Sequence, residues 1–277
     1  MADIQLLVLD IDGTIAGRAN EVTTAVKEAI AAVQAQGIQV AIATGRMYQA
    51  AVRFHQAVGS SLPLLSYQGA LIKDPLSGRI HRHTPLSRKH ALALLQALAD
   101  LEAQQQLSIH LYINDQLHVR SVLADTRDYA ERSGVQPIAV GDLIAFLESQ
   151  PAIETTKLLA LSPDPTVVTD ILKRLQQTYS PQELYLTQSV ATFFEATHPS
   201  SNKGTAVKFL AEELLGLTSE QVMTIGDNFN DFEMLRYAQI GVAMGDAPAG
   251  VKAIADWVAP SVEEEGVVAA INHFLLA

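Results

Sequence analysis

The sequence contains no cysteine among its 277 residues. This absence excludes disulfide bonds, thiolate metal sites and a cysteine nucleophile, and it suits a reducing compartment. No apolar run reaches the roughly 20 residues that a membrane-spanning helix needs, and no basic segment precedes an apolar stretch near Met1. A secretory signal is therefore not expected. We predict a cytoplasmic protein without a membrane partner.

Positive charge is also scarce. The chain has 19 Lys and Arg against 30 Asp and Glu, which gives a formal net charge of −11, and its basic residues form no run. Long-range repulsion of this kind opposes general affinity for nucleic acid, so no nucleic-acid partner is expected. A local positive pocket remains compatible with an acidic protein. The sequence does not indicate an oligomeric state.

Apolar segments alternate with amphipathic ones at both ends of the chain. The composition, 48% hydrophobic and 18% charged, is typical of a globular protein, and the length suggests about two domains. Short apolar runs predict buried strands, and apolar residues at helical spacing predict helices between them. This alternation predicts an α/β core whose parallel sheet is flanked by helices. The predicted strands are 4–9, 38–43, 64–66, 222–225 and 240–243, and the predicted helices are 22–36, 47–58, 205–215, 230–237 and 262–275.

The pattern changes in the middle of the chain. A long Leu/Ala-rich helix is predicted over 88–106, and a hairpin is predicted around Asn114-Asp115. The strands of the hairpin are 108–113 and 116–120. Further helices are predicted at 125–132 and 166–178, and further strands at 153–161, 183–189 and 192–196, without a strict alternation. We therefore predict an α+β domain at 85–196, inserted into a core domain that comprises 1–84 and 197–277.

The strongest local signal is the segment Asp10-Ile11-Asp12-Gly13-Thr14, which directly follows a predicted buried strand. In open α/β sheets, ligands bind beyond the carboxyl ends of the strands. Strand alternation points Asp10 and Asp12 the same way. Two such carboxylates can bind one hard cation, or divide the roles of nucleophile and acid/base. Gly13 permits the sharp turn that this arrangement needs.

Two other interpretations of this segment exist. Asp-Gly-Thr also forms ordinary turns. A calcium loop is a second possibility, because Asp10, Asp12, Thr14 and Glu21 have the spacing of its ligands. However, Ile15 occupies the position that requires glycine, and a strand precedes the segment where a calcium loop has a helix.

Two further segments precede predicted helices. Thr44 and Gly45 offer a hydroxyl and an unhindered N–H before one helix, and helix N-termini hold anions well. Thr44 would equally serve as an ordinary helix cap. Lys203 precedes another helix and could supply a fixed positive charge to a phosphate. The glycine that a P-loop requires upstream is missing, so a surface lysine is the competing interpretation.

A last polar segment, Gly226-Asp227-Asn228-Phe229-Asn230-Asp231, follows another apolar strand. Acid and amide groups, among them those of Asp227, Asn230 and Asp231, crowd one strand–helix turn. A structural cap accounts for one of them, but less easily for all. The segment is polar enough to complete a cation site with Asp10 and Asp12.

Together, and in this order, these segments resemble the motifs of the haloacid dehalogenase (HAD) superfamily of phosphohydrolases. The inserted block resembles the cap of the Cof-type subfamily, which has a class IIB cap on a Rossmann-like core. The resemblance implies Asp10 as nucleophile and Asp12 as acid/base. It implies Mg²⁺ at Asp10, Asp227 and the backbone carbonyl of Asp12, with Asp231 in support. It implies phosphate binding at Ile11, Thr44, Gly45, Lys203 and Asn230.

One position departs from the family pattern, because Gln68 stands in Tyr67-Gln68-Gly69-Ala70 where relatives usually have Asn. The resemblance implies a Mg²⁺-dependent phosphatase that acts on a small phosphorylated metabolite, with a sugar phosphate the leading expectation. Phosphomutases use the same motifs, and a non-catalytic binding or regulatory module on a HAD scaffold is the alternative outside enzymes. Intact Asp10, Asp12, Lys203 and Asp227 argue against that second alternative.

Overall fold

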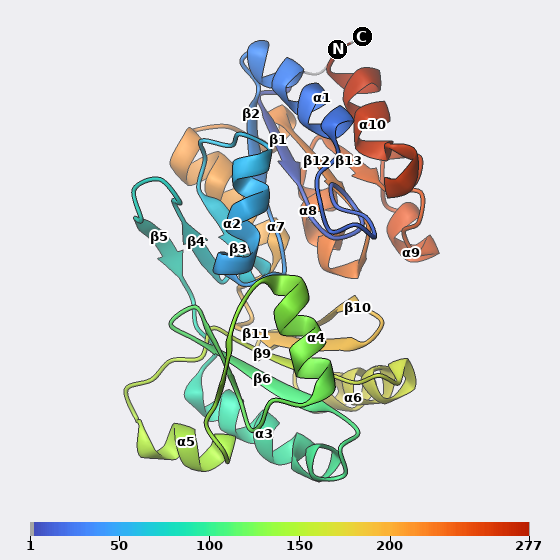
Figure 1. Ribbon diagram of the computed structural model, residues 1–277. Coiled ribbons are helices and arrows are strands. Elements are labelled where there is room, and N and C mark those ends of the chain that lie inside the picture. Colours follow the sequence, from blue (N-terminus) through green and yellow to red (C-terminus); the bar gives the residue numbers. More distant parts are fainter. Residues whose placement is uncertain (1–2, 277) are drawn as a thin grey trace. The chain divides into compact units, whose positions relative to one another are not determined.

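A computed structural model describes residues 3–276, and the chain divides into two compact units (Figure 1). The core unit consists of Met1–Arg82 and Asn202–Ala277, and the inserted unit is His83–Ser201. Among the described residues, no helix is both long enough and apolar enough to cross a membrane.

The core unit contains a five-stranded parallel sheet with the order β14-β13-β12-β1-β2. All four residues of the central strand β1 are buried, as expected for a parallel sheet that is covered on both faces. β1 pairs with β2 on one side and with β12 on the other. The strands are β1 (Leu6–Leu9), β2 (Gln39–Ile42), β12 (Val222–Gly226), β13 (Ile240–Ala243) and β14 (Trp257–Val258).

Helices cover both faces of this sheet. Leu6 and Val8 pack into one apolar cluster with Ala206 and Leu210, whereas α1 and α10 lie side by side elsewhere in the unit (Figure 1). The helices are α1 (Thr24–Ala35), α2 (Tyr48–Ala57), α7 (Lys203–Lys208), α8 (Phe232–Tyr237), α9 (Ala249–Lys252) and α10 (Gly266–Phe274), and a π-helical segment, Phe209–Leu215, continues α7. A small sheet contains β3 (Leu64–Ser66), β4 (Leu71–Lys73) and β5 (Ile80–His83). The predicted α/β class with a parallel sheet is confirmed.

The inserted unit is built on a six-stranded sheet with the order β10-β11-β9-β6-β7-β8. Its strands are antiparallel except for β7 and β8. The strands are β6 (Ser108–Ile113), β7 (Gln116–Val119), β8 (Pro137–Ala139), β9 (Lys157–Leu161), β10 (Tyr185–Val190) and β11 (Phe193–Thr197). The helices are α3 (Arg88–Ala103), α4 (Ala124–Ser133), α5 (Leu143–Ser149) and α6 (Pro165–Thr178).

The two faces of this second sheet differ in chemistry. Alternate residues of β6, such as Ile109 and Leu111, pack with α3 and α6 in an apolar core. The residues between them face α4, where His110 Nε2 lies 3.1 Å from Thr126 Oγ1. A buried ion pair joins Lys157 Nζ to Glu195 Oε2 across 2.9 Å on the neighbouring strands. These buried polar side chains are therefore paired with one another on this face of the sheet.

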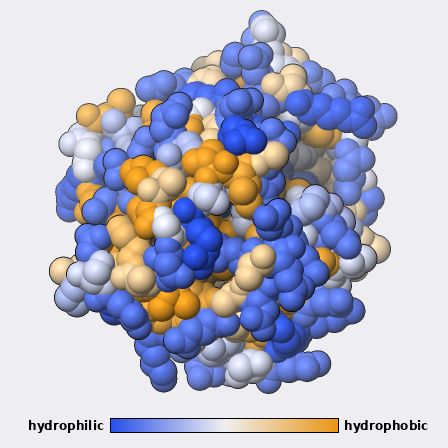
Figure 2. All heavy atoms as spheres, turned by 60° about the horizontal axis from the view of Figure 1, so that its bottom comes forward, coloured by the Kyte–Doolittle hydropathy of each residue, from blue (hydrophilic) through white to orange (hydrophobic). Residues whose placement is uncertain are grey.

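The surface combines polar and hydrophobic side chains (Figure 2). The face shown in Figure 2 is mostly hydrophilic, with hydrophobic residues between the polar ones. Such a mixture is ordinary for a globular protein. The large hydrophobic residues that are exposed lie in different elements and turns, namely Leu76, Ile80, Leu123, Ile138, Val190, Phe229 and Val258.

Candidate active site

Three aspartates converge at the carboxyl end of the core sheet. Asp10 directly follows β1 and Asp227 directly follows β12, and these strands are paired in parallel with Leu9 opposite Ile225. Asp10, Asp227 and Asp231 each place a carboxylate oxygen within 4.8 Å of the others. The parallel register therefore brings together groups that lie more than two hundred residues apart in the sequence.

Lys203 supplies the positive charge of this cluster. It is the first residue of α7 and is 1% exposed. Its Nζ lies 2.6 Å from Asp10 Oδ1 and 2.5 Å from Asp231 Oδ1. Burial alone would lower the pKa of Lys203, but the two carboxylates outweigh burial and raise it above its ordinary value. Lys203 is therefore a fixed cation beside Asp10.

Asp231 has a supporting position. Its Oδ1 binds Lys203, and its Oδ2 accepts hydrogen bonds from the N–H groups of Asp227 (2.9 Å) and Asn228 (3.0 Å). Both oxygens are therefore engaged within the protein, and Asp231 holds the turn that carries Asp227. The supporting role that the family resemblance implies for Asp231 stays a prediction.

The cluster holds more carboxyl groups than its lysine can balance. Burial raises the pKa of Asp10 to about 7, helped by repulsion from Asp231 and opposed by Lys203. Burial and the charges of Asp231 and Asp10 raise the pKa of Asp227 to about 9. One lysine faces three carboxylates, so a hard cation with oxygen ligands would relieve the repulsion. With Asp231 engaged elsewhere, Asp10 and Asp227 are the side chains that fit such a cation.

The turn after β1 requires glycine at position 13. Gly13 has a φ of +77°, and a β-carbon there would lie 2.4 Å from Asp227 Oδ2. The carbonyl of Ile11 accepts the N–H groups of Thr14, Ile15 and Ala16, which closes the turn. The absence of a side chain at Gly13 therefore lets Asp227 approach the first motif.

Asp12 lies apart from the acidic cluster. Its carboxylate accepts two hydrogen bonds from Arg46, from Nε at 2.8 Å and from Nη2 at 2.6 Å. The same Nη2 donates to Asn20 Oδ1 at 2.6 Å. The sequence prediction placed Asp12 among the metal ligands through its backbone carbonyl, and its side chain is bound to Arg46. Any metal contact of Asp12 would therefore involve its backbone carbonyl, as the resemblance implies.

Thr44 is buried and Gly45 is half-buried in a loop whose geometry differs in one respect from the expectation. α2 begins at Tyr48, so these residues precede the helix by several positions. Thr44 Oγ1 accepts the N–H of Arg46 at 3.1 Å. A β-carbon on Gly45 would lie 2.4 Å from Gln68 Nε2. The loop is therefore shaped by its own hydroxyl and by Gln68.

Sequence reasoning assigned no role to Arg46 or Gln68. Arg46 directly follows the predicted positions Thr44 and Gly45, and the departure at Gln68 was visible as an unusual residue. Gln68 is fully buried, and its Oε1 accepts from Asn230 Nδ2 at 3.3 Å. The structure therefore joins the predicted phosphate-binding positions Gly45 and Asn230 through a residue that the motifs do not contain.

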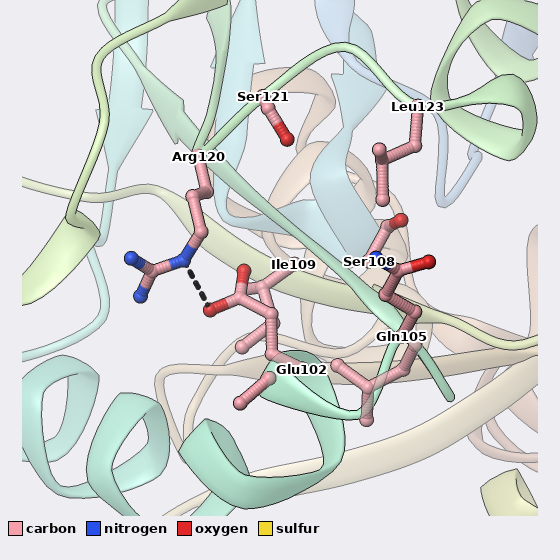
Figure 3. A pocket seen from close by; sticks show the side chains of 9 residues that line it. Glu102, Gln105, Ser108, Ile109, Arg120, Ser121 and Leu123 are labelled. Carbon is pink, nitrogen blue, oxygen red and sulfur yellow. Dashed lines mark hydrogen bonds and ion pairs between the residues drawn. The ribbon is translucent and has the colours of Figure 1, made fainter.

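A cavity of about 190 Å³ lies within the inserted unit, beside Ser108 and Arg120 (Figure 3). Arg120 Nε donates to Glu102 at 2.9 Å, and its Nη1 donates to Asp142 at 3.0 Å. These two carboxylates offset the charge of Arg120, which makes the cavity a poor site for an anion. The acidic cluster of the core unit remains the candidate active site.

Comparison with known proteins agrees with this geometry. The sequence profile of the haloacid dehalogenase-like hydrolases matches residues 7–271. Phosphatase YwpJ of Bacillus subtilis (strain 168) is 27% identical, over 98% of this chain and all of that protein. The 5-amino-6-(5-phospho-D-ribitylamino)uracil phosphatase YcsE of the same organism is 28% identical, over 99% and 97% of the two chains.

A solved haloacid dehalogenase-like hydrolase from B. subtilis superimposes with a TM-score of 0.84 at 25% identity, covering 98% of this chain and all of that one. Another from Bacteroides thetaiotaomicron gives 0.80, also at 25% identity, with 98% and 100% covered. The family predicted from the motifs is therefore confirmed, and the chain belongs to the haloacid dehalogenase-like hydrolases.

Proposed function

We propose that the protein is a Mg²⁺-dependent phosphatase that hydrolyses a small phosphorylated metabolite through a phosphoaspartate on Asp10. The observation that carries the proposal is the position of Asp10, buried between Lys203 and Asp227 at the end of β1. A nucleophilic carboxylate beside a fixed cation and a second carboxylate suits attack on a phosphoryl dianion. The phosphatase relatives support the same reaction.

Each residue of the site has a separate role in the proposed reaction. Bound Mg²⁺ at Asp10, Asp227 and the Asp12 carbonyl would neutralise phosphoryl oxygens. Lys203 adds fixed positive charge, and the phosphate-binding positions are Ile11, Thr44, Gly45 and Asn230. Asp10 attacks phosphorus, and the bond to the leaving oxygen breaks while Asp12, protonated and released from Arg46, gives that oxygen a proton. Asp12 then takes a proton from water, whose oxygen attacks the aspartyl phosphate and releases inorganic phosphate.

We assign substrate selection to the inserted unit, which corresponds to the domain predicted at 85–196. Its proposed role is that of a cap domain. A sugar phosphate is the leading candidate. The relative YcsE is named for a substrate that carries a phosphorylated ribityl chain, which supports a polyol-like leaving group. The compartment is proposed to be the cytoplasm, in keeping with a chain that has no cysteine.

The test is phosphate release from p-nitrophenyl phosphate and from a panel of sugar phosphates, with Mg²⁺, with Ca²⁺ and after chelation. We expect turnover only with Mg²⁺, because the looser coordination of Ca²⁺ misplaces the nucleophile. Asp74→Asn, which changes a turn carboxylate of the same unit outside the acidic cluster, is the control variant and should keep full activity. Equal turnover after thorough chelation would contradict the metal dependence. Transfer of phosphate within a sugar, with little phosphate released, would indicate a mutase.

A further inference from the structure

The turn Tyr67–Gly69 of the core unit has an unusual backbone. Its three residues have φ angles of 54°, 58° and 88°, all in the left-handed region. Tyr67 and Gln68 carry β-carbons, for which this conformation is unfavourable, and both are fully buried. Such a conformation persists only where the surrounding structure holds it.

Hydrogen bonds and close packing hold this turn in place. The N–H of Tyr67 donates to the carbonyl of Arg46, and the N–H of Gln68 donates to the carbonyl of Thr44, both at 2.9 Å. A β-carbon on Gly69 would lie 2.5 Å from Ala206 Cβ, on the helix that begins with Lys203. The turn is therefore hydrogen-bonded to the loop that contains Thr44 and packed against α7.

The side-chain amide of Gln68 lies between two proposed phosphate-binding positions. Its Oε1 accepts from Asn230 Nδ2 at 3.3 Å, and its Nε2 occupies the space that a β-carbon on Gly45 would need. Asn230 is 4% exposed, and its Oδ1 has no hydrogen-bond partner within residues 3–276. A buried amide oxygen without a partner is costly.

An anion changes which end of the Asn230 amide is favourable. A phosphoryl group accepts hydrogen bonds, so Asn230 must offer it Nδ2 and not Oδ1. A half-turn of both amides exchanges nitrogen and oxygen. Gln68 Nε2 then donates to Asn230 Oδ1, and Asn230 Nδ2 takes the place of the unpartnered oxygen. Only a side chain with both a donor and an acceptor supports both arrangements.

We infer that Gln68 is a positioning residue of the phosphoryl site, and that it acts by orienting the amide of Asn230. The inference rests on the proposed function, because it needs an anion at Asn230. It assigns a purpose to the strained turn, which places a buried amide between Gly45 and Asn230.

The test is a double-mutant cycle between Gln68→Met and Asn230→Ala, with the dissociation constant of inorganic phosphate in the presence of Mg²⁺ as the first readout. Methionine keeps the length of glutamine but has no amide. We expect Gln68→Met to weaken phosphate binding about tenfold, the scale of one oriented hydrogen bond to a charged group. The same change should cost nothing further in the Asn230→Ala background.

Kinetics provide the second readout. Because Asn230 would hold the phosphoryl group in both ground and transition states, Gln68→Met should raise KM and leave kcat nearly unchanged. Gln34→Met is the matched control, since the Gln34 amide binds the carbonyls of Val58 and Gly59 in the same unit. This control should bind phosphate as the unmodified protein does.

Gln68→Glu covers the case in which Gln68→Met does not fold. It keeps the shape of glutamine but only accepts hydrogen bonds, so it should bind phosphate more weakly than the unmodified protein. Unchanged binding in either variant, or an equal loss with and without Asn230, would overturn the inference. An unmodified protein that neither binds phosphate nor releases it would instead overturn the proposed function.

Discussion

Asp10 and Asp12 lie two residues apart, yet their carboxylates have different surroundings. Asp10 is buried beside Lys203. The Asp12 side chain is 39% exposed, and its carboxylate accepts hydrogen bonds from Nε and Nη2 of Arg46. A buried carboxylate next to a cation suits a nucleophile that must meet a dianion. A more accessible carboxylate suits proton exchange with the leaving group and with water.

We expect the substitutions Asp10→Asn and Asp12→Ala to have different kinetic signatures. Asp10→Asn removes the attacking carboxylate, so no phosphoenzyme should form. With Asp12→Ala, an aryl oxide still leaves unaided, but the water of the second step lacks its base. General acid–base help is typically worth about 10²–10⁴-fold, so the second step should become limiting. Rapid-quench kinetics with labelled aryl phosphate should then show a burst of phenol and an alkali-labile phosphoprotein.

The leaving group provides the control for this experiment. An alkyl alkoxide needs a proton, so Asp12→Ala should slow the first step with alkyl phosphates far more than with aryl phosphates. Label on Asp10→Asn, or equal losses with both kinds of substrate, would mean that the two roles are misassigned.

At this scale the sequence predicted which residues would meet, but not all of their contacts. Asp10 and Asp227 each end a buried strand, and the pairing of parallel strands brings such positions together. The contacts of Arg46 and Gln68 depend on loop conformation. Gln68 takes a left-handed backbone without being glycine, aspartate or asparagine, so local residue preferences gave no signal for it.

At the scale of elements, the start of α7 fixes the position of Lys203. Asn202 caps this helix: its Oδ1 accepts the N–H of Thr205 at 2.8 Å, and Thr205 Oγ1 accepts the N–H of Asn202 at 3.3 Å. This reciprocal pair is a capping box. The orientation of Lys203 towards Asp10 therefore depends on the residue before it.

We predict that Asn202→Ala lowers the free energy of unfolding by about 1 kcal/mol, the usual cost of losing a cap, and also raises KM. Thr23→Ala is the matched control, because Thr23 caps α1 in the same unit. It should cost similar stability without affecting KM. Urea unfolding and steady-state kinetics on both variants provide the measurement. A similar KM increase in both would show that the cap matters only for stability.

Two predicted helices differ from the observed elements for identifiable reasons. The apolar pattern over 262–275 predicts one helix, but Glu265 is left-handed and separates a short 3₁₀ turn from α10. A β-carbon on Gly266 would lie 2.2 Å from the carbonyl oxygen of Pro260, so close packing forces the break there. The helix predicted over 205–215 instead passes from α7 into a π-helical segment, because apolar spacing does not distinguish the two windings.

At the scale of the whole molecule, the inserted unit interrupts a core built from both ends of the chain. The structure divides the units at His83 and Ser201, whereas the sequence placed the inserted domain at 85–196. The elements of the inserted unit that were not predicted, β8 and α5, are three and seven residues long. Segments this short carry little periodicity.

The inserted unit should lose stability in mild acid because of His110. Burial, together with the charge of Lys157, lowers the pKa of His110 to about 3. Between that value and the ordinary pKa of 6.5, the unfolded state binds a proton that the folded state does not. Stability should therefore decrease as the pH falls below 6.5, by up to about 1.4 kcal/mol per pH unit.

Urea unfolding between pH 5 and 6.5, followed by circular dichroism, tests this prediction above the range in which most carboxylates titrate. His110→Gln should flatten the dependence, because it removes the titrating group. The single tryptophan, Trp257, lies in the core unit, so its fluorescence follows that unit separately. An equally steep dependence in His110→Gln would rule out His110 as the cause.

The pairing of β1 with β12 sets the order in which the protein can be completed during synthesis. β1 leaves the ribosome early, but β12, one of its two neighbours in the sheet, is translated only after the whole inserted unit has been made. The inserted unit is one continuous stretch of chain and has its own apolar core, so it can fold while the core sheet still lacks three strands. Asp10 is therefore made long before Lys203 and Asp227. The nascent chain can assemble the acidic cluster only in the last part of translation.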